Sequence, residues 1–567
     1  MNVIGKAAAA NTFDAIVVGS GITGGWAAKE LTQKGLRTLV LERGRNVEHV
    51  TDYPTALWHP WEVPYRGRDT RDRVAEYPVQ SQNYAFSDAT KHFYVKDTDH
   101  PYTQQSPFWW IRGYQVGGKS LIWGRQTYRW SDLDFTANAR DGHGVDWPIR
   151  YADLAPWYSY VEKYVGISGQ TEHIPHLPDS EFLPPFEMNC VEKMVKGKIE
   201  KQFPGRRMSI SRVAHLTVQH RGRGLCQARS LCERGCPFGG YFSSVSSTIP
   251  DARATGRLTL KPESVVTEVL FDAKKQRATG VRVLDVATNE TTDYFAPIIF
   301  LNGGTLNTTG LLMRSVSDRF PNGLGNDSDT LGRYLMDHQK NIGATASVEG
   351  FEDSYYYGRR PAQVMIPRFR NISPDTQRTD YVRGFMTYGG ASRAGWQQVL
   401  QQPGFGVELK DAATHPGPWR MQLSTYGECL PYADNRVTLN RNVLDVNGLP
   451  TLNIDAKFRE NEAAMRKDMG ASAVEMLETI GLKNVKQYED HNVIGFSVHE
   501  MGTARMGRDP KTSMLNAHNQ LHAVKNVFVT DGSAMASTAC QNPSLTYMAL
   551  TARAANFAVS ELKKKNL

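Results

Sequence analysis

Residues 14–44, DAIVVGSGITGGWAAKELTQKGLRTLVLERG, constrain the fold of this chain more than any other stretch. Residues 15–18 form a short apolar run typical of a buried parallel strand, and a G-x-G-x-x-G turn follows directly. A helical pattern comes next and ends at Gly35, and a second apolar strand over 37–41 leads to Glu42. Glu42 lies 18 residues after Gly24, close to the spacing of dinucleotide-binding units. The full context predicts nucleotide binding.

Each glycine of this turn has its own role in such a unit. Gly19 allows the tight turn, Gly21 lets the backbone approach a pyrophosphate, and Gly24 lets helix and strand pack closely. The free N–H groups at the start of the helix bind phosphates, and Glu42 accepts hydrogen bonds from ribose hydroxyls.

The length of 567 residues favours two domains, and the nucleotide-binding domain is predicted to be discontinuous. Alternating segments between 332 and 489 predict an antiparallel sheet, followed by a long helix over 460–480. The predicted class is therefore α/β, a Rossmann-like domain with an α+β substrate domain of antiparallel sheet and helices. The predicted boundaries are 1–170, 241–330 and 491–567 for the nucleotide domain, 171–240 for a substrate-side insertion and 331–490 for the substrate domain.

Composition excludes several classes of function. No run of 18 apolar residues exists, so no transmembrane helix is predicted. The first ten residues, MNVIGKAAAA, do not form a secretory signal, so the chain is not expected to export itself. The net charge is +8, but the basic residues are scattered rather than clustered with aromatic ones. A mildly basic surface, able to meet an acidic protein partner, is favoured over nucleic-acid binding.

Five stretches in the same order resemble the glucose–methanol–choline (GMC) flavoprotein oxidoreductases. They are GSGITG with Glu42, QVGGKSLIWG at 115–124, the strand and glycines at 298–304, HEMGT at 499–503, and Asp531-Gly532 with Asn542-Pro543. The chain is most similar to the large subunits of bacterial gluconate 2-dehydrogenase and glucoside 3-dehydrogenase. The resemblance implies FAD as cofactor, held by residues Gly19, Gly21, Ile22, Thr23, Gly24, Glu42, Arg43, Gly113, Gly117, Gly118, Ser120, Trp123, Gly124, Val266, Gly303, Asp531, Gly532, Asn542, Pro543 and Thr546.

Oxidising an alcohol to a carbonyl by hydride transfer needs an acceptor for the hydride and a base for the hydroxyl proton. FAD is the acceptor, and His499 matches the position of the family's catalytic histidine. Asn542 matches the opposite position and is expected to bond the substrate hydroxyl as donor and acceptor. Because some relatives carry a second histidine there, the asparagine leaves His499 as the sole base. Glu500 either tunes the imidazole or is a solvated glutamate, the interpretation that we favour.

Three of the six cysteines, Cys226, Cys232 and Cys236, lie within eleven residues, and a proline follows the third. Incidental buried cysteines are one interpretation, and a Cys3His zinc site with His215 or His220 is another. We favour iron–sulfur ligation, because three thiolates with a Cys-Pro ending suit a 3Fe–4S cluster and similar spacing occurs in cluster-carrying FAD sugar dehydrogenases. Cys190 is the upstream residue that would convert the site to 4Fe–4S.

The predicted function is oxidation of a ring hydroxyl of a sugar or glycoside to a keto-sugar, with electrons leaving through the cluster to a cytochrome or quinone. The alternative is an oxygen-using pyranose or C-glycoside oxidase, and a third class is a non-enzymatic flavin-binding protein. The resemblance also implies a small signal-bearing subunit, a cytochrome c acceptor and a periplasmic location, with a cytoplasmic one as alternative. Aromatic residues of the second domain stack on sugar rings or pack the core: Tyr355, Tyr356, Tyr357, Trp396 and Trp419.

Overall fold

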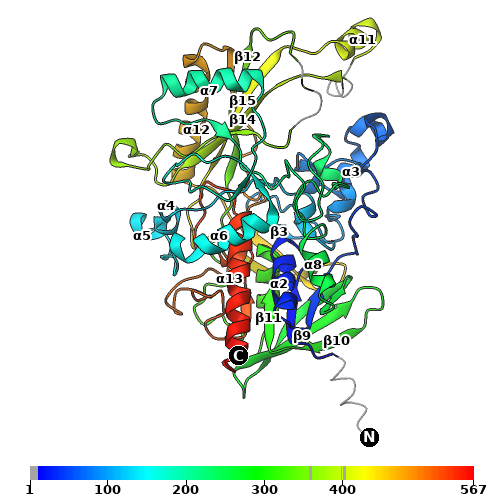
Figure 1. Cartoon of the computed structure of the whole chain (residues 1–567). Coiled ribbons are helices and arrows are strands. Elements are labelled where there is room, and N and C mark those ends of the chain that lie inside the picture. The colour runs from blue at the N-terminus through cyan, green and yellow to red at the C-terminus, as the bar shows by residue number, and fades with distance from the viewer. Residues whose placement is uncertain (1–10, 355, 357–359, 397–398, 400–403) are drawn as a thin grey trace.

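A parallel sheet of five strands lies at the centre of the nucleotide-binding half (Figure 1). The computed structural model describes residues 11–354, 356, 360–396, 399 and 404–567. The sheet has the order β19-β11-β1-β2-β7 and takes its strands from distant parts of the chain. They are β1 (Ala15–Val18), β2 (Thr38–Leu41), β7 (Leu258–Lys261), β11 (Ile298–Leu301) and β19 (Val527–Val529). The predicted α/β class and the discontinuity of this half are confirmed.

Two layers cover this sheet because its central strands are apolar on both faces. On one face α2 (Ile22–Gln33) and α13 (Ser544–Lys563) pack side by side (Figure 1). On the other face lies a meander of β8 (Ser264–Asp272), β9 (Arg277–Asp285) and β10 (Thr291–Phe295), together with α9 (Thr305–Arg314). The β pattern over residues 258–283 predicts one hairpin-like meander. That prediction is wrong for 258–261, which pairs with β2 in the parallel sheet.

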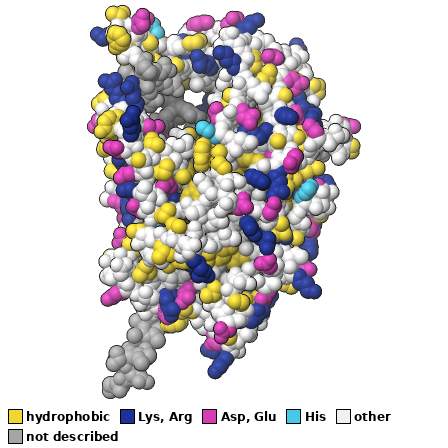
Figure 2. Space-filling model, turned by 180° about the vertical axis from the view of Figure 1, so that it is seen from behind, with side chains coloured by type: hydrophobic (Ala, Val, Ile, Leu, Met, Phe, Trp, Pro, Cys, Tyr) yellow, Lys and Arg dark blue, Asp and Glu magenta, His cyan; other side chains and the backbone are white. Residues whose placement is uncertain are grey.

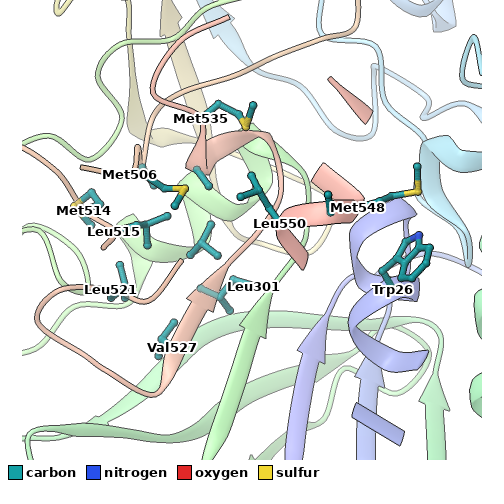
Figure 3. Packing of buried hydrophobic residues seen from close by; sticks show 14 of the residues in the cluster. Trp26, Leu301, Met506, Met514, Leu515, Leu521, Val527, Met535, Met548 and Leu550 are labelled. Carbon is teal, nitrogen blue, oxygen red and sulfur yellow. The ribbon is translucent and has the colours of Figure 1, made fainter. Parts of the chain in front are cut away.

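The largest buried cluster joins these layers to the C-terminal segment (Figure 3). In Figure 3 Leu301 of β11 and Val527 of β19 lie below Met548 and Leu550 of α13, and Trp26 of α2 stands beside them. Burial of these side chains contributes roughly 1.5–3 kcal/mol each to folding. The C-terminal strand and helix are therefore part of the nucleotide-binding core rather than an appended tail.

A six-stranded antiparallel sheet forms the upper half in Figure 1, with the order β18-β12-β15-β14-β13-β6. Its helices are α12 (Glu460–Thr479) and α7 (Cys190–Gln202), whose apolar residues share one buried cluster with the strands. The strands are β6 (Ser209–Ile210), β12 (Gln339–Val348), β13 (Val364–Ile366), β14 (Phe385–Arg393), β15 (Trp419–Gly427) and β18 (Lys483–Glu489).

Two predicted strands of the antiparallel domain lie elsewhere. β16 (Arg436–Leu444) pairs with β17 (Pro450–Asp455), and β17 pairs with β3 (Thr103–Gln104), in a separate sheet whose β16 packs against α9. Their alternating pattern correctly predicted strands, but alternation does not specify which sheet a strand joins. The predicted domain boundaries stay predictions.

The segment over residues 45–110 is mostly irregular and carries short helical turns. No helix among the described residues has both the length and the hydropathy needed to cross a bilayer. Figure 2 shows one face on which Lys and Arg side chains are mixed with Asp and Glu. The remaining elements are α6 (Tyr151–Val165), α8 (Thr248–Ala254), η1 (Pro60–Glu62), η2 (Pro64–Gly67), α3 (Arg71–Glu76), η3 (Gln80–Gln82), η4 (Lys91–Phe93), η5 (Gly118–Leu121), α4 (Asp132–Phe135), α5 (Ala137–Asp141), β4 (Ile167–Ser168), β5 (Phe182–Leu183), η6 (Cys232–Arg234), η7 (Pro374–Thr376), α11 (Gly406–Thr414) and η8 (Gly532–Ala534).

Candidate active site

A cavity of about 280 Å³ opens at the carboxyl ends of the parallel strands, where α/β sheets bind nucleotides. The loops after β1, β2, β11 and β19 line it, together with the glycine loop at 113–124 and the loop that carries His499. Most of the predicted site residues line this one cavity: Gly19, Gly21, Ile22, Thr23, Glu42, Arg43, Gly113, Gly118, Ser120, Trp123, Gly124, Val266, Gly303, His499, Asp531, Gly532 and Asn542.

Four of the predicted flavin-binding residues are not among those that line the cavity. Gly24 packs against the backbone of Gly19, where a Cβ would lie 1.9 Å from the carbonyl oxygen of Gly19. Gly117 packs against Val245, and the Thr546 hydroxyl hydrogen-bonds the Tyr158 hydroxyl at 2.8 Å. Pro543 precedes the first turn of α13. These residues therefore pack behind the cavity wall and are not placed to contact a ligand in the cavity directly.

The cavity wall fits a dinucleotide in shape and in hydrogen-bonding capacity. A Cβ built on Gly21 or Gly304 meets no atom within 4 Å, so the backbone is open to a ligand at both glycines. Glu42 accepts hydrogen bonds from the Ser20 hydroxyl at 2.6 Å and the Gly44 N–H at 3.0 Å. Two buried polar atoms of the wall, Asn302 Nδ2 and Tyr547 Oη, have no hydrogen-bond partner among the described residues. Such atoms suit a polar ligand.

Burial raises the pKa of Glu42, and the hydrogen bonds from Ser20 and Gly44 oppose that rise. Burial likewise raises the pKa of Asp531, which accepts hydrogen bonds from Ser533, from the Thr308 hydroxyl and from the Gly304 N–H at 2.9 Å. Asp531 therefore joins the end of β19 to the glycine turn after β11.

His499 and Asn542 meet at the other end of the cavity. The Nδ2 atom of Asn542 lies 3.3 Å from Nε2 of His499, and the Oδ1 atom of Asn542 accepts a hydrogen bond from the Tyr388 hydroxyl at 2.7 Å. On its other side, the ring of His499 contacts His338, with 2.9 Å between the two Nδ1 atoms. His338 Nε2 in turn bonds the backbone carbonyl of Ala539. The pair predicted from the sequence is thus part of a longer hydrogen-bonded chain.

Asp337 holds the backbone of the His499 loop. Its carboxylate accepts hydrogen bonds from the N–H groups of Gly495 at 2.8 Å, Ser497 at 3.1 Å and His499 at 3.0 Å. Val498 has a φ of +61°, which is rare for a β-branched residue and clusters at functional sites. Burial, followed by the charge of Glu500, raises the pKa of Asp337 to about 6. The strained loop is therefore fixed by one buried acid.

Burial lowers the pKa of His499 well below its ordinary value, and the neighbouring His338, Lys340 and Lys119 lower it further. The imidazole is therefore neutral near pH 7 and able to accept a proton. Glu500 is 6% exposed and forms an ion pair with Lys119 at 2.9 Å, so the favoured interpretation of Glu500 as a solvated glutamate is wrong. Lys340 is buried, its ammonium lies 4.1 Å from the ring centre of Phe496, and burial lowers its pKa to about 8.

Sequence reasoning missed His338, Asp337, Lys340 and Tyr388. The first three lie together at the start of β12. His338 is 161 residues before His499, whose ring it contacts. The one signal was an Asp-His pair directly before an alternating apolar run.

The cysteine loop lies against the cavity wall. Arg125, which lines the cavity, donates a hydrogen bond to the Cys232 carbonyl at 2.9 Å, and the Tyr241 hydroxyl donates to the Leu121 carbonyl at 2.7 Å. The N–H of Ala228 donates to Cys226 Sγ at 3.4 Å and that of Gly240 to Cys236 Sγ at 3.3 Å.

Among the residues described, no group of three Cys, His, Asp or Glu side chains is close enough to hold a single metal ion. His220 Nε2 bonds the Lys163 carbonyl at 2.9 Å, whereas His215 Nε2 lies 3.7 Å from Cys232 Sγ. These contacts count against the zinc alternative with His220. Cys190 packs against the core of the six-stranded sheet, so it is not brought to the loop.

The aromatic residues of the second domain do not line the cavity where they are described. Trp419 is buried against Tyr356, and Trp396 stacks on the exposed Trp61. Tyr355 and Tyr357 lie outside the described residues. Core or surface packing is therefore the role of Trp419 and Trp396 in this structure.

Comparison with known proteins assigns the family. The chain matches the GMC oxidoreductase family over residues 13–340 and 431–551. The 2-methyl-1,2-propanediol dehydrogenase of Mycolicibacterium austroafricanum is 26% identical over 97% of this chain and 95% of that protein. The fructose dehydrogenase large subunit of Gluconobacter japonicus is 25% identical over 97% of this chain and 98% of its own length.

Among solved structures, formate oxidase of Aspergillus oryzae RIB40 has the same fold. It superposes with a TM-score of 0.62 at 14% sequence identity and covers 98% of this chain and 99% of that chain. With the dinucleotide cavity and the histidine–asparagine pair at its end, these matches show that the chain belongs to the GMC oxidoreductase family, as an FAD-dependent oxidoreductase that acts on alcohol groups.

Proposed function

We propose that this enzyme oxidises a ring hydroxyl of a sugar or glycoside to a keto group, with His499 as the base. The observation that carries the proposal is the neutral imidazole that faces the cavity beside Asn542. His499 Nε2 takes the proton of the substrate hydroxyl, and the amide of Asn542 holds the oxygen. Bound FAD would supply the acceptor for the hydride that leaves the carbon.

Two observations support a sugar as substrate. The relative from Gluconobacter japonicus is named as a fructose dehydrogenase subunit, and it aligns with nearly the whole chain. The cavity is also lined by polar and aromatic side chains, Asn83, Tyr84 and Gln126, which suit several hydroxyl groups and a ring face.

The test is His499→Ala, compared with wild type in stopped-flow reduction of the bound flavin by a panel of hexoses and glycosides. We expect FAD to remain bound and flavin reduction to slow by at least about a hundredfold, the scale of a lost general base. His518→Ala, a histidine that stacks on Phe557 and does not line the cavity, is the matched control and should match wild type. Near-wild-type rates in His499→Ala would remove His499 as the base, and absence of reduction by any sugar would remove the substrate class.

We further propose that Cys226, Cys232 and Cys236 bind an iron–sulfur cluster of the 3Fe–4S type. The N–H donors to two of the sulfurs support it, because N–H···S contacts tune clusters. A single zinc ion would bring thiolates to within about 3.8 Å of one another, given Zn–S bonds of about 2.3 Å. In a cluster each thiolate binds a different iron, so the three sulfurs need not meet at one ion. Such a cluster would carry single electrons from the flavin to a cytochrome or quinone.

Burial raises the pKa of the Cys232 thiol to about 11, and nearby Glu233, Cys226 and Cys236 add to that rise while Arg125 opposes it. A thiol of this kind binds metal only as a thiolate. Because a buried thiolate is unfavourable without a metal, the proposal predicts that the cysteine loop is more stable with the cluster bound than without it.

Cys232→Ser tests this assignment. The purified wild-type protein should contain about three irons per chain and should be brown rather than yellow. The variant should lose iron and electron delivery to its acceptor, while sugar-dependent flavin reduction survives. Cys190→Ser is the matched control and should keep the iron. Iron absent from wild type, with oxygen consumed in step with sugar oxidation, would instead support the oxygen-using oxidase.

We propose that the chain reaches the periplasm with a small signal-bearing subunit and passes electrons to a cytochrome c. The large-subunit name of the Gluconobacter japonicus relative supports a multi-subunit assembly. Fractionation of cells that co-express the chain with its genomic neighbours tests the idea, and recovery in the cytosol alone would favour the cytoplasmic alternative.

A further inference from the structure

We propose that His338 is a positioning residue that fixes the tautomer of His499 and so leaves Nε2 of His499 as the proton acceptor. The inference rests on the proposed role of His499 as the base. It adds a residue, distant in sequence, that makes this role chemically specific. A chain of hydrogen bonds runs from Ala539 through His338, His499 and Asn542 to Tyr388, and the direction of each bond fixes the tautomer.

The Ala539 end of this series of hydrogen bonds fixes which atoms donate and which accept. The Ala539 carbonyl only accepts, so the proton of the contact with His338 lies on Nε2 of His338. A neutral imidazole carries one N–H, so Nδ1 of His338 is then an acceptor. The 2.9 Å contact between the two Nδ1 atoms therefore requires His499 to donate from its own Nδ1. His499 is left with an acceptor lone pair on Nε2.

The neutral state of His338 on which this step depends follows from its surroundings. His338 is 2% exposed, and burial lowers its pKa to about 4. Near neutral pH it carries one ring proton. A doubly protonated His338 would have two donors and would force the opposite tautomer on His499.

The other end of the chain gives the same direction independently. The Tyr388 hydroxyl donates to Oδ1 of Asn542, so the NH₂ group of Asn542 faces Nε2 of His499 at 3.3 Å. An NH₂ group only donates, and Nε2 must therefore accept. Both ends require the same tautomer. A substrate hydroxyl that enters the cavity meets an atom that can take its proton.

Neither of the two acids near His499 sets this tautomer. Asp337 contacts the backbone N–H of His499 rather than its ring. Glu500 is paired with Lys119. The proton taken up at Nε2 turns the ring into an imidazolium, which still donates from Nδ1 to His338 in a charge-assisted hydrogen bond. The titratable and charged groups that face the His499–His338 pair are Asp337, Lys340, Lys119, Glu500, Tyr388 and Tyr426.

The first test reads the tautomer directly, without activity. Protein labelled with ¹⁵N in its histidine rings should show, near neutral pH, a His499 with a protonated Nδ1 and an unprotonated Nε2, assigned by loss of the signals in His499→Ala. In His338→Leu only the longer 3.3 Å contact with Asn542 still favours this tautomer, so the two His499 nitrogens should move toward a mixture of tautomers. A wild-type His499 with its proton on Nε2 would overturn the inference, even if His499→Ala is inactive.

The second test separates positioning from packing. His338→Leu should lower kcat by about ten- to a hundredfold with little change in KM, because the contacts to substrate are untouched. His338→Asn places an amide oxygen near the position of Nδ1, accepts from His499, and should stay within about threefold of wild type. Equal losses in Asn and Leu, with FAD content and Tm unchanged, would contradict the inference. If His499 carries its proton on Nδ1 but no sugar reduces the bound flavin, only the proposed substrate is contradicted.

Discussion

At the residue scale, the pKa of the base His499 depends on the charges around the imidazole as well as on its burial. Lys340 and Lys119 both lower the pKa of His499, so its neutral form persists well into the acid range. Lys340→Met removes one of these charges, and the pKa of His499 should rise. The acid limb of the rate of flavin reduction should then move to higher pH, whereas Lys340→Arg, which keeps the charge, should leave it in place. An unchanged pH profile in Lys340→Met would show that Lys340 does not act on His499.

The sequence predicted His499 and Asn542 because both lie within short motifs of a recognisable family. It could not predict His338 or Tyr388, which reach the same point from 161 residues before His499 and 154 residues before Asn542. The sequence around these two residues contains no motif that identifies them, since their role arises from strands that pack against the nucleotide half. Glu500 was misjudged for the same reason: its burial depends on Lys119, 381 residues away.

At the scale of elements, different glycines of the turn after β1 serve cofactor binding and folding. Gly21→Ala places a methyl group where no protein atom lies within 4 Å, so the apoprotein should keep its Tm while FAD affinity falls about tenfold or more. Gly24→Ala places a methyl group 1.9 Å from the Gly19 carbonyl, so it should destabilise the fold itself. Thermal unfolding of apoprotein and flavin titration check the pair. Equal Tm losses in both variants would refute this division of roles.

Elements buried on both faces were predictable because their sequences are short, apolar and bounded by turns. β1, β2, β11 and β19 all follow that rule. β7 and the β16–β17 pair were assigned to the wrong sheets because their sequences specify a strand but not its neighbours. Pairing partners are chosen by tertiary packing, which a single sequence does not display.

At the scale of the whole molecule, buried charges join the two halves. Arg383, beside β14, pairs with Asp141 of α5 and donates to Asn138 at 2.7 Å. Within the antiparallel half, Arg368 pairs with Glu428 at 2.8 Å, and the charge of Glu428 acts across the boundary on Asp134 of α4. His499 and Asn542, which line the cavity, contact His338 and Tyr388 of the antiparallel half, so the seam holds that half against the His499 loop. Breaking one partner of a buried pair is costly, because the other charge is left without compensation.

Asp134 of α4 is the pH-sensitive member of this seam. Burial, followed by the charge of Glu428, raises the pKa of Asp134 to about 7 from an ordinary 3.8. The folded state therefore binds a proton that the unfolded state has released. The stability that Asp134 contributes is full below pH 3.8 and is lost as the pH rises through 7. Asp134→Asn mimics the protonated acid, since its amide oxygen still accepts from Ser131.

We expect Asp134→Asn to exceed wild type in Tm slightly at pH 5, where part of the stabilisation is already lost, and more at pH 8.5, where wild type buries a charge. Each unit of pKa shift is worth about 1.4 kcal/mol, so the gain should amount to a few kcal/mol at the alkaline end. Asp132→Asn, an exposed acid on the same helix, is the matched control and should show no such pH dependence. Scanning calorimetry at the two pH values measures the difference. A Tm gain of equal size at both would mean that the Asp134→Asn substitution improves packing alone, and that the charge of Asp134 does not couple the seam to pH.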